Sequence, residues 1–248
     1  MKLDDVKKLH HKKYRNQFGY FLVEGEHLIL ELFKAVKAPA QRRATRLFIT
    51  EDYQNWAESH ASHWPITLVS KKQMSQLSDT KTPQGIVACV PFSALDSPIR
   101  KAQHTKKYIY LHEIQDPGNL GTIMRTLAWF GNFSLLLSPN SVDPHNSKVI
   151  RASMGAIFHL PMEQEVPLHA LPERFDNFAY LDLRGKPVTH PDFNNYSCYL
   201  FGNEARGVPQ ETLSAFDAKA FTIPGKGEIE SLNVASALGI CAFQLSLE

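Results

Sequence analysis

Hydrophobic positions in the first 90 residues follow two spacings. Apolar residues that recur every three or four positions predict a helix with one apolar face between 28 and 36. Short continuous apolar runs predict strands at 47–49, 66–69 and 85–90. A short helix over 71–77 fits between the last two strands, and a further apolar stretch at 20–23 precedes the first helix. This alternation predicts a compact α/β unit that ends near Val90.

The pattern after residue 108 alternates more regularly. Five apolar runs predict strands at 108–111, 134–137, 178–181, 198–201 and 220–223. Three longer stretches predict helices at 119–130, 147–154 and 233–245. Asn119 is a residue type that caps helix starts, and Gly131 is one that follows helix ends. Strands that alternate with helices predict a mostly parallel sheet covered on both faces.

The stretch between these two patterns has a different composition. Prolines, serines and a basic run replace the apolar positions from 91 to 107, which is typical of a linker. The sequence therefore predicts a small α/β domain at 1–92, a linker at 93–107 and a second α/β domain at 108–248.

Composition narrows the class of protein. The chain has 248 residues, of which 43% are hydrophobic and 21% charged, as expected for a globular protein with one large or two small domains. No apolar run approaches the roughly 18–20 residues that span a bilayer. The N-terminus also lacks the apolar core of a secretory signal. We therefore expect a cytoplasmic protein that contacts no membrane.

Positive charge is unevenly distributed, although the net charge is only +2. Basic residues gather near the N-terminus, around 42–46 and between 100 and 107. Any one such cluster is more typical of a solvated surface. Three clusters within the first 107 residues favour a face that contacts phosphate.

Cysteine and histidine give no sign of a metal site. Cys89, Cys198 and Cys241 lie in apolar stretches and form no CxxC pair, so they are typical of small core residues in a reducing compartment. His10 and His11 are adjacent, and no Cys/His ligand spacing follows them. We expect no bound metal.

Three polar strings follow predicted strands in the second domain. They are 116–125 (DPGNLGTIMR), 201–204 (FGNE), and 223–224 with 230–235 (IP and ESLNVA). Since ligands bind at the carboxyl ends of strands in open α/β sheets, these strings predict a binding site. The usual GxGxxG and GxxxxGK[ST] phosphate loops are absent, so any nucleotide-like ligand must be held by other loops.

Each string has an ordinary structural use as well as a chemical one. Arg125 lies in an otherwise apolar helix, so it needs an anionic ligand, a wet cleft or a buried partner such as Glu204. Gly202 lets a ligand approach the backbone, but glycine is also common in strand-to-helix turns. Ser231 and Asn233 are helix-capping types, and the glycine-containing loop before them can also wrap a ligand.

In order and spacing, the three strings resemble the signature motifs of the SpoU family of RNA 2′-O-ribose methyltransferases, within the SPOUT superfamily. The resemblance covers 108–248. The stretch from 12–15 (KKYR) to 22–25 (LVEG) also resembles the small substrate-binding domain that precedes the catalytic domain in many members. The sequence is thus similar to enzymes that methylate RNA.

The resemblance implies a fold, a cofactor and an assembly. The family's catalytic domain is a parallel α/β sheet whose C-terminal segment forms a trefoil knot, a feature that pattern reasoning would not propose. S-adenosylmethionine sits in the knot, and members act as homodimers with sites near the subunit interface. By match to the motifs, the cofactor pocket is expected to involve Leu200, Phe201, Gly202, Ile223 and Leu232.

The resemblance also implies the polar site and the RNA surface. The residues that match the family's catalytic positions are Asn119, Arg125, Glu204, Ser231 and Asn233. The basic first domain is expected to hold the RNA, and its candidate contacts are Lys12, Lys13, Arg15, Arg42 and Arg43.

Arg125 matches the residue that the family is proposed to use to activate the 2′-hydroxyl. A guanidinium has a pKa above about 12 and rarely gives up its proton. Arg125 could instead bind the neighbouring phosphate while that phosphate or a water accepts the proton, or a dry, cationic site could lower its pKa. We favour the phosphate contact, with Glu204 orienting Arg125 through a charge-assisted pair.

Three alternatives stay open on the sequence. Ribosomal RNA is the favoured substrate, because a first domain of this type is more usual in ribosomal RNA enzymes, and transfer RNA is the alternative. A catalytically silent RNA-binding or ribosome-assembly factor is a second, which the intact site residues disfavour. Methylation of a base nitrogen is a third.

The chain departs from the family pattern at Gly225, at 235–236 and at 111–114 (LHEI), where we interpret His112 and Glu113 as surface residues.

Overall fold

The computed structural model describes residues 1–95 and 107–247. The predicted linker at 93–107 lies almost wholly outside these residues, as do Arg100, Lys101 and Lys106 of the third basic cluster. The chain divides into two compact units. The first holds residues 1–95 together with Asp143–His159, and the second holds 107–142 together with 160–247.

The first unit contains a four-stranded sheet, made of β1 (Tyr20–Glu24), β2 (Arg46–Ile49), β3 (Ile66–Leu68) and β4 (Ile86–Pro91). The strand order is β1-β4-β2-β3, with β4 antiparallel to both of its neighbours and β3 parallel to β2. Every residue of β4 is buried, as its unbroken apolar run predicts for a central strand. The predicted strands and the α/β class of this unit are confirmed.

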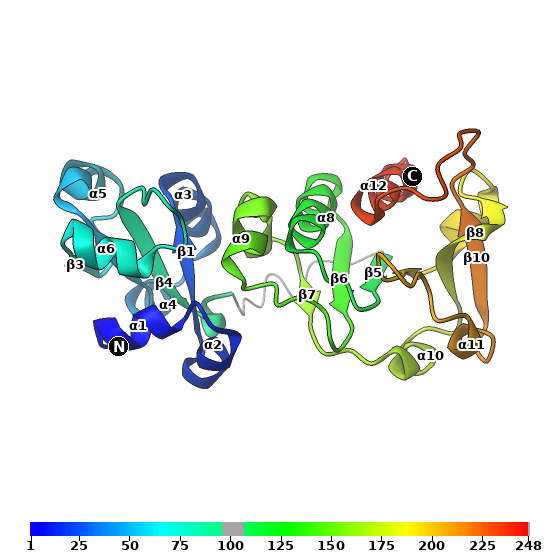
Figure 1. Cartoon of the computed structure of the whole chain (residues 1–248), viewed down its shortest axis with the longest axis horizontal. Coiled ribbons are helices and arrows are strands. Elements are labelled where there is room, and N and C mark those ends of the chain that lie inside the picture. The colour runs from blue at the N-terminus through cyan, green and yellow to red at the C-terminus, as the bar shows by residue number, and fades with distance from the viewer. Residues whose placement is uncertain (96–106, 248) are drawn as a thin grey trace. The chain divides into compact units, whose positions relative to one another are not determined.

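Seven α-helices belong to the described part of the first unit (Figure 1). They are α1 (Leu3–Lys8), α2 (Lys12–Phe18), α3 (Glu26–Ala35), α4 (Pro39–Ala44), α5 (Gln54–His60), α6 (Lys71–Leu77) and α9 (Ser147–Ser153). The predicted helix at 71–77 is confirmed to the residue, and Ser70 with Gln73 forms a capping box at its start. Sequence periodicity missed α1, α2, α4 and α5, which are too short to show a clear apolar face.

The segment Asp143–His159 follows a strand of the second unit but packs in the first. Asp143 accepts hydrogen bonds from Arg15, at 2.9 Å from Nε and 2.5 Å from Nη2. The ring of His145 lies 4.8 Å from that of Phe21 and 4.6 Å from that of Phe92. These contacts join residues far apart in sequence, so Asp143–His159 packs with the first unit although it lies within the range 108–248 predicted for the second domain.

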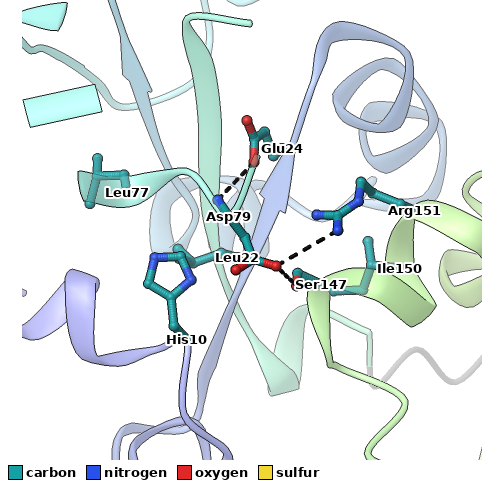
Figure 2. Close-up of a pocket in the computed structure, with 8 residues that line it drawn as sticks. All are labelled: His10, Leu22, Glu24, Leu77, Asp79, Ser147, Ile150 and Arg151. Carbon is teal, nitrogen blue, oxygen red and sulfur yellow. Dashed lines mark hydrogen bonds and ion pairs between the residues drawn. The ribbon is translucent and has the colours of Figure 1, made fainter. Parts of the chain in front are cut away.

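A second set of contacts fixes α9 to the first unit, and Figure 2 shows it. Glu24 accepts the backbone N–H of Asp79, and Asp79 in turn accepts the hydroxyl of Ser147 and pairs with Arg151 at 3.7 Å. The hydroxyl of Thr80 also donates to Glu24. The carboxylate of Glu24 thus orders the turn at 78–80, and the carboxylate of Asp79 in that turn holds Ser147, the first residue of α9.

The second unit contains a six-stranded sheet, made of β5 (Lys107–Leu111), β6 (Phe133–Leu137), β7 (Met162–Glu163), β8 (Phe178–Pro187), β9 (Cys198–Phe201) and β10 (Ala218–Thr222). The strand order is β10-β8-β9-β5-β6-β7, and every pair is parallel. The predicted parallel sheet is confirmed. Every residue of β9 is buried, and β5 is buried over its last three residues, 109–111.

The helices of the second unit are α8 (Pro117–Phe130), α10 (Leu171–Arg174), α11 (Gln210–Leu213) and α12 (Val234–Leu245). The short 3-10 turns of the two units are Glu51–Tyr53, Phe92–Ala94, Ala156–Phe158, Leu168–Ala170 and Pro191–Asn195. Helices α8 and α12 pack on each other (Figure 1). None of the helices in the described ranges is long and apolar enough to cross a membrane.

The two ends of α8 test the predicted caps. Asp116, not Asn119, is the N-cap: its carboxylate accepts the backbone N–H of Asn119 at 2.7 Å, and Pro117 opens the helix. The prediction for Asn119 is wrong because both residues are capping types and the one nearer the strand takes the position. Gly131 follows the helix at a φ of 69°, as predicted. The side chain of Asn119 is thereby left for other contacts.

Candidate active site

A cavity of about 590 Å³ lies in the second unit, at the carboxyl ends of its strands. All three polar strings contribute to its wall. Eight of the ten predicted catalytic and cofactor residues line it: Asn119, Phe201, Gly202, Glu204, Ile223, Ser231, Leu232 and Asn233. Leu200 and Arg125 do not.

Gly202 is required where it stands because two stretches of backbone meet there. A Cβ on Gly202 would lie 2.2 Å from the carbonyl carbon of Gly207. Asn203 and Gly207 exchange two backbone hydrogen bonds of 2.9 and 2.8 Å, which close a tight loop after β9. The amide oxygen of Asn203 accepts the N–H groups of Ala205 and Arg206, so this buried side chain holds the loop from inside.

A chain of hydrogen bonds joins the three strings. The side-chain amide of Asn233 donates to Oδ1 of Asn119 at 2.9 Å. Asn119 in turn donates from Nδ2 to Oε1 of Glu204 at 3.3 Å. Glu204 also accepts the backbone N–H groups of Gln115 and Asp116, at 3.2 and 3.1 Å. Residues 114 positions apart in sequence thus act as one network at one wall of the cavity.

Asn233 has the capping role that its residue type predicts as well as a place in this network. Its Oδ1 accepts the N–H groups of Ala235 and Ser236, at 2.9 and 3.3 Å, at the start of α12. The same side chain therefore fixes the helix start with one end and Asn119 with the other. Ser231 and Leu232, just before it, are exposed on the cavity wall.

Arg125 lies apart from the cavity of its own chain. It sits on the exposed face of α8 with Thr122 and Trp129, one turn away on either side. Within residues 1–95 and 107–247 its guanidinium has no ion pair and no hydrogen bond. The predicted Arg125–Glu204 pair is therefore absent, because Glu204 is committed to the amides at the other end of the helix.

Leu200 and Phe201 have different positions although both end β9. Both are buried, but only Phe201 reaches the cavity wall. Leu200 packs in the core with Tyr110, Leu136 and Phe178. Leu200 thus supports the strand that leads into the site, as the motif match implies, without lining it.

The five predicted RNA contacts of the first unit differ in burial: three are exposed, one is half-buried and one is buried. Lys12 and Lys13 are exposed on α2, and Arg43 is exposed on α4. Arg42 is half-buried, donates from Nε to the carbonyl of Val36 at 3.2 Å and lies 6.0 Å from the ring of Trp64.

Arg15 contradicts the prediction of a phosphate contact. It is only 4% exposed. Its guanidinium donates to Asp143 and also to the carbonyls of Leu9 and His10, both at 2.8 Å. Because the donors of the guanidinium point at acceptors within the unit, the side chain is committed to the fold.

Several lining residues lie outside the three strings, among them Leu181, Asp182, Leu183 and Arg206. Asp182 follows the predicted strand at 178–181, so the rule that found the strings, a polar residue directly after a strand, also applies to it. Arg206 pairs with Glu113.

The interpretation of His112 and Glu113 as surface residues is wrong. Both are half-buried, and burial lowers the pKa of His112. The Nδ1 atom of His112 is buried with no hydrogen-bond partner in the described chain. The carbonyl of Glu113 accepts the side-chain amide of Asn203 at 2.7 Å, so this stretch braces the loop after β9.

No group of three or more His, Cys, Asp or Glu residues that could hold a metal ion is found among residues 1–95 and 107–247. The polar side chains that line the cavity are three amides, two carboxylates, two hydroxyls and one guanidinium: Asn119, Asn203, Asn233, Asp182, Glu204, Thr222, Ser231 and Arg206.

Residues 106–243 match the family described as the SpoU rRNA Methylase family. The chain belongs to this family. Residues 2–88 match a second family, the MRM3-like substrate binding domain. Both matches confirm the resemblance: the first covers the three polar strings, and the second covers the basic stretch near the N-terminus. The hydrogen bonds of Asn119, Glu204 and Asn233 join the three strings that lie within the first match.

Alignments with two relatives span almost the whole chain. It is 31% identical to the 23S rRNA (guanosine(2553)-2'-O)-methyltransferase RlmP of Bacillus subtilis, over 98% of this chain and 95% of the relative. It is 30% identical to an uncharacterised tRNA/rRNA methyltransferase of Synechocystis, over 96% and 88%. The AdoMet-bound rRNA methyltransferase of Sinorhizobium meliloti has a similar structure, with a TM-score of 0.79, 26% identity and coverage of 98% and 93%.

Proposed function

We propose that this SpoU family member transfers a methyl group from S-adenosylmethionine to a ribose 2′-hydroxyl of ribosomal RNA. The observation that carries the proposal is the cavity whose wall joins Asn233, Asn119 and Glu204 through hydrogen bonds. The name of the Bacillus relative, a 23S rRNA 2′-O-methyltransferase, and the substrate-binding match at 2–88 favour ribosomal over transfer RNA.

The cavity fits the cofactor in size and in chemistry. Its volume of about 590 Å³ lies within the range of small-molecule sites. Phe201, Ile223 and Leu232 offer apolar surface, and the closed loop at Gly202 and Gly207 brings backbone to the wall. The carboxylates of Asp182 and Glu204 suit a ligand with a sulfonium and an ammonium group. When bound, S-adenosylmethionine supplies an electrophilic methyl group.

The protein's own residues supply alignment and manage the proton. Asn119 and Asn233 hold one another, so their positions relative to the cavity are fixed before a ribose arrives. Ser231, exposed on the same wall, offers a hydroxyl to the ribose. Glu204 fixes Asn119 and the start of α8 and does not pair with Arg125.

Arg125 acts on the RNA as a phosphate clamp. Its guanidinium is exposed, and an arginine stays charged at neutral pH. It therefore binds the phosphate next to the target ribose, and that phosphate or a water takes the 2′-hydroxyl proton.

We further propose a homodimer in which Arg125 of each copy completes its partner's site. Arg125 does not line its own cavity, and Trp129 beside it is 84% exposed. Helix α12, in contact with α8, exposes Ile240 and Phe243, and Leu247 just beyond its end is exposed as well. Apolar faces of this kind favour an interface.

Complementation between subunits tests this arrangement. Arg125→Ala leaves the cavity intact but removes the guanidinium, whereas Gly202→Ala leaves Arg125 intact but disrupts the cavity. Each variant is therefore expected to be inactive as a homodimer. Mixed dimers then contain one complete site and recover turnover. If Arg125 serves its own chain, the mixture stays inactive.

The C-terminal path supports a trefoil knot in the second unit, which we include in the proposal. Strand β10 lies at the edge of the sheet, yet the chain after it lines the cavity through 231–234 and then packs as α12 on α8. We also propose a cytoplasmic location, because the three free, buried thiols suit a reducing compartment.

Arg125→Ala tests the proposed function directly. Calorimetry with S-adenosylhomocysteine is expected to give a Kd close to that of the parent protein, because Arg125 lies outside the cavity. Methyl transfer to ribosomal RNA is expected to disappear. Near-normal turnover in this variant would refute the role of Arg125, and a parent protein that binds no S-adenosylhomocysteine would refute the proposal itself.

A further inference from the structure

Strand β8 leaves its ladder at the edge of the cavity. Tyr180 pairs with Ala220 of β10, and the next paired residue, Lys186, stands opposite Phe221. Between these two pairs β8 has five additional residues, 181–185, whereas β10 has none. These five residues are called the excursion of β8. The excursion returns close to β10 at Gly185, where a Cβ would lie 2.6 Å from the carbonyl carbon of Ala220.

This excursion brings Leu181, Asp182 and Leu183 to the cavity wall. Tyr180 also pairs with Leu200 of β9, so the excursion starts at the carboxyl edge of the sheet, beside the loop that carries Gly202 and Glu204. Leu183 is 71% exposed although it is apolar. An exposed leucine beside a carboxylate on a cavity wall is better suited to a ligand than to the fold.

Asp182 is held in place but has acceptor capacity left. Its Oδ1 accepts the backbone N–H of Arg184 at 2.9 Å, and its Oδ2 accepts the side-chain amide of Gln210 at 2.6 Å. An ionised carboxylate offers about four lone-pair sites, so about two remain. No ion pair of Asp182 occurs within the described ranges, and its negative charge on the wall is uncompensated.

The other charged side chains of the wall are already used. Glu204 accepts from Gln115, Asp116 and Asn119. Arg206 is paired with Glu113. Asp182 is therefore the carboxylate that is positioned, charged and still able to accept hydrogen bonds from a ligand.

We propose that Asp182 is a cofactor-binding residue that accepts hydrogen bonds from a donor group of S-adenosylmethionine, either its ammonium or its ribose hydroxyls. Gln210 is the positioning residue that fixes the carboxylate. This inference rests on the proposed function, and it assigns a cofactor contact to a residue outside the three polar strings. A hydrogen bond to a charged group contributes enough to change affinity by about tenfold or more.

Calorimetric titration with S-adenosylhomocysteine tests the proposal without relying on turnover. Asp182→Asn keeps the shape and an acceptor for Arg184, so the unit is expected to stay folded while the Kd rises by about tenfold. Glu211→Gln, a neighbouring exposed carboxylate that does not line the cavity, is the control and is expected to leave the Kd unchanged. Thermal unfolding of both variants checks the fold.

A second ligand identifies the donor. 5′-Methylthioadenosine keeps the ribose hydroxyls and lacks the ammonium. If Asp182→Asn weakens both ligands, Asp182 binds the hydroxyls; if it weakens S-adenosylhomocysteine alone, Asp182 binds the ammonium. An unchanged Kd for S-adenosylhomocysteine in Asp182→Asn overturns the proposal, whereas a parent protein that binds neither ligand overturns the proposed function instead.

The positioning role of Gln210 has its own test. Gln210→Ala is expected to weaken S-adenosylhomocysteine binding in the parent protein and to have no further effect in the Asp182→Asn background. Equal decreases in affinity in both backgrounds would show that Gln210 acts through the general stability of the loop and not through Asp182.

Discussion

The buried pair of Arg15 and Asp143 carries the sharpest stability prediction. Replacing Asp143 by alanine leaves a guanidinium that is 4% exposed with two carbonyl partners and no counter-charge. Removing one partner of a buried ion pair costs about 3–5 kcal/mol. That is a large part of the roughly 5–15 kcal/mol by which a typical domain is stable. We therefore expect Asp143→Ala to lower the unfolding midpoint of the first unit steeply.

Guanidinium chloride unfolding followed by tryptophan fluorescence measures this destabilisation in the right unit. Trp56 and Trp64 lie in the first unit, whereas Trp129 in the second is 84% exposed and reports little. A compensating double variant, Arg15→Met with Asp143→Leu, is expected to regain most of the stability, because apolar replacements of buried ion pairs are often neutral. A destabilisation below about 1 kcal/mol in Asp143→Ala would refute the reasoning.

The same double variant separates the fold from RNA binding. Each phosphate that a protein binds contributes about 0.7–0.9 to the slope of log affinity against log salt. Because Arg15 is committed to Asp143, the slope for ribosomal RNA is expected to stay unchanged in the double variant. A slope reduced by about one would restore Arg15 as a residue that binds phosphate.

Three further predictions concern the RNA surface, the acid stability and the cavity. Lys12→Ala with Lys13→Ala is expected to reduce the salt slope of RNA binding by roughly 0.7–0.9 for each phosphate that is no longer bound, with no change in unfolding, because both side chains are exposed. Burial alone would raise the pKa of Asp143, but His145 and Arg15 outweigh it and hold that pKa well below its usual range. The contribution of Asp143 to folding stability is therefore complete above about pH 4, the pKa of an aspartate in the unfolded chain, and disappears as the pH falls further. Acid unfolding is therefore expected to be steeper for the parent protein than for Asp143→Asn. Gly202→Ala is expected to abolish S-adenosylhomocysteine binding in calorimetry, since a Cβ there meets backbone at 2.2 Å; a Kd within a few-fold of the parent would contradict this.

Local patterns predicted the elements well where apolar spacing and cap type agree. The bounds of α6 and β9 follow from local spacing and residue type, and Asn233, one of the two capping types named with Ser231, is the N-cap of α12. The start of α8 did not, because Asp116 and Asn119 are both capping types and the choice depends on backbone geometry.

Burial and long-range partners set the limit of sequence reasoning about the site. Arg15 stands in a basic run beside Lys12 and Lys13, and only Asp143, 128 positions away, makes it a buried residue. Asp182 directly follows the predicted strand at 178–181, yet its place on the cavity wall depends on an excursion of β8 and on the register with β10. Arg125 matches its motif, yet it is exposed on α8 and does not line the cavity that eight of the other motif residues share.

The position of the transferred methyl group tests the central claim most directly. The parent protein is incubated with unmethylated ribosomal RNA and S-adenosylmethionine labelled in the methyl group, and the RNA is then hydrolysed in alkali. Alkaline cleavage needs a free 2′-hydroxyl, so a methyl group on that oxygen protects the adjoining bond. We expect the label in alkali-resistant dinucleotides, and its disappearance with Arg125→Ala. Label in mononucleotides, which indicates base methylation, or no label at all would contradict the account.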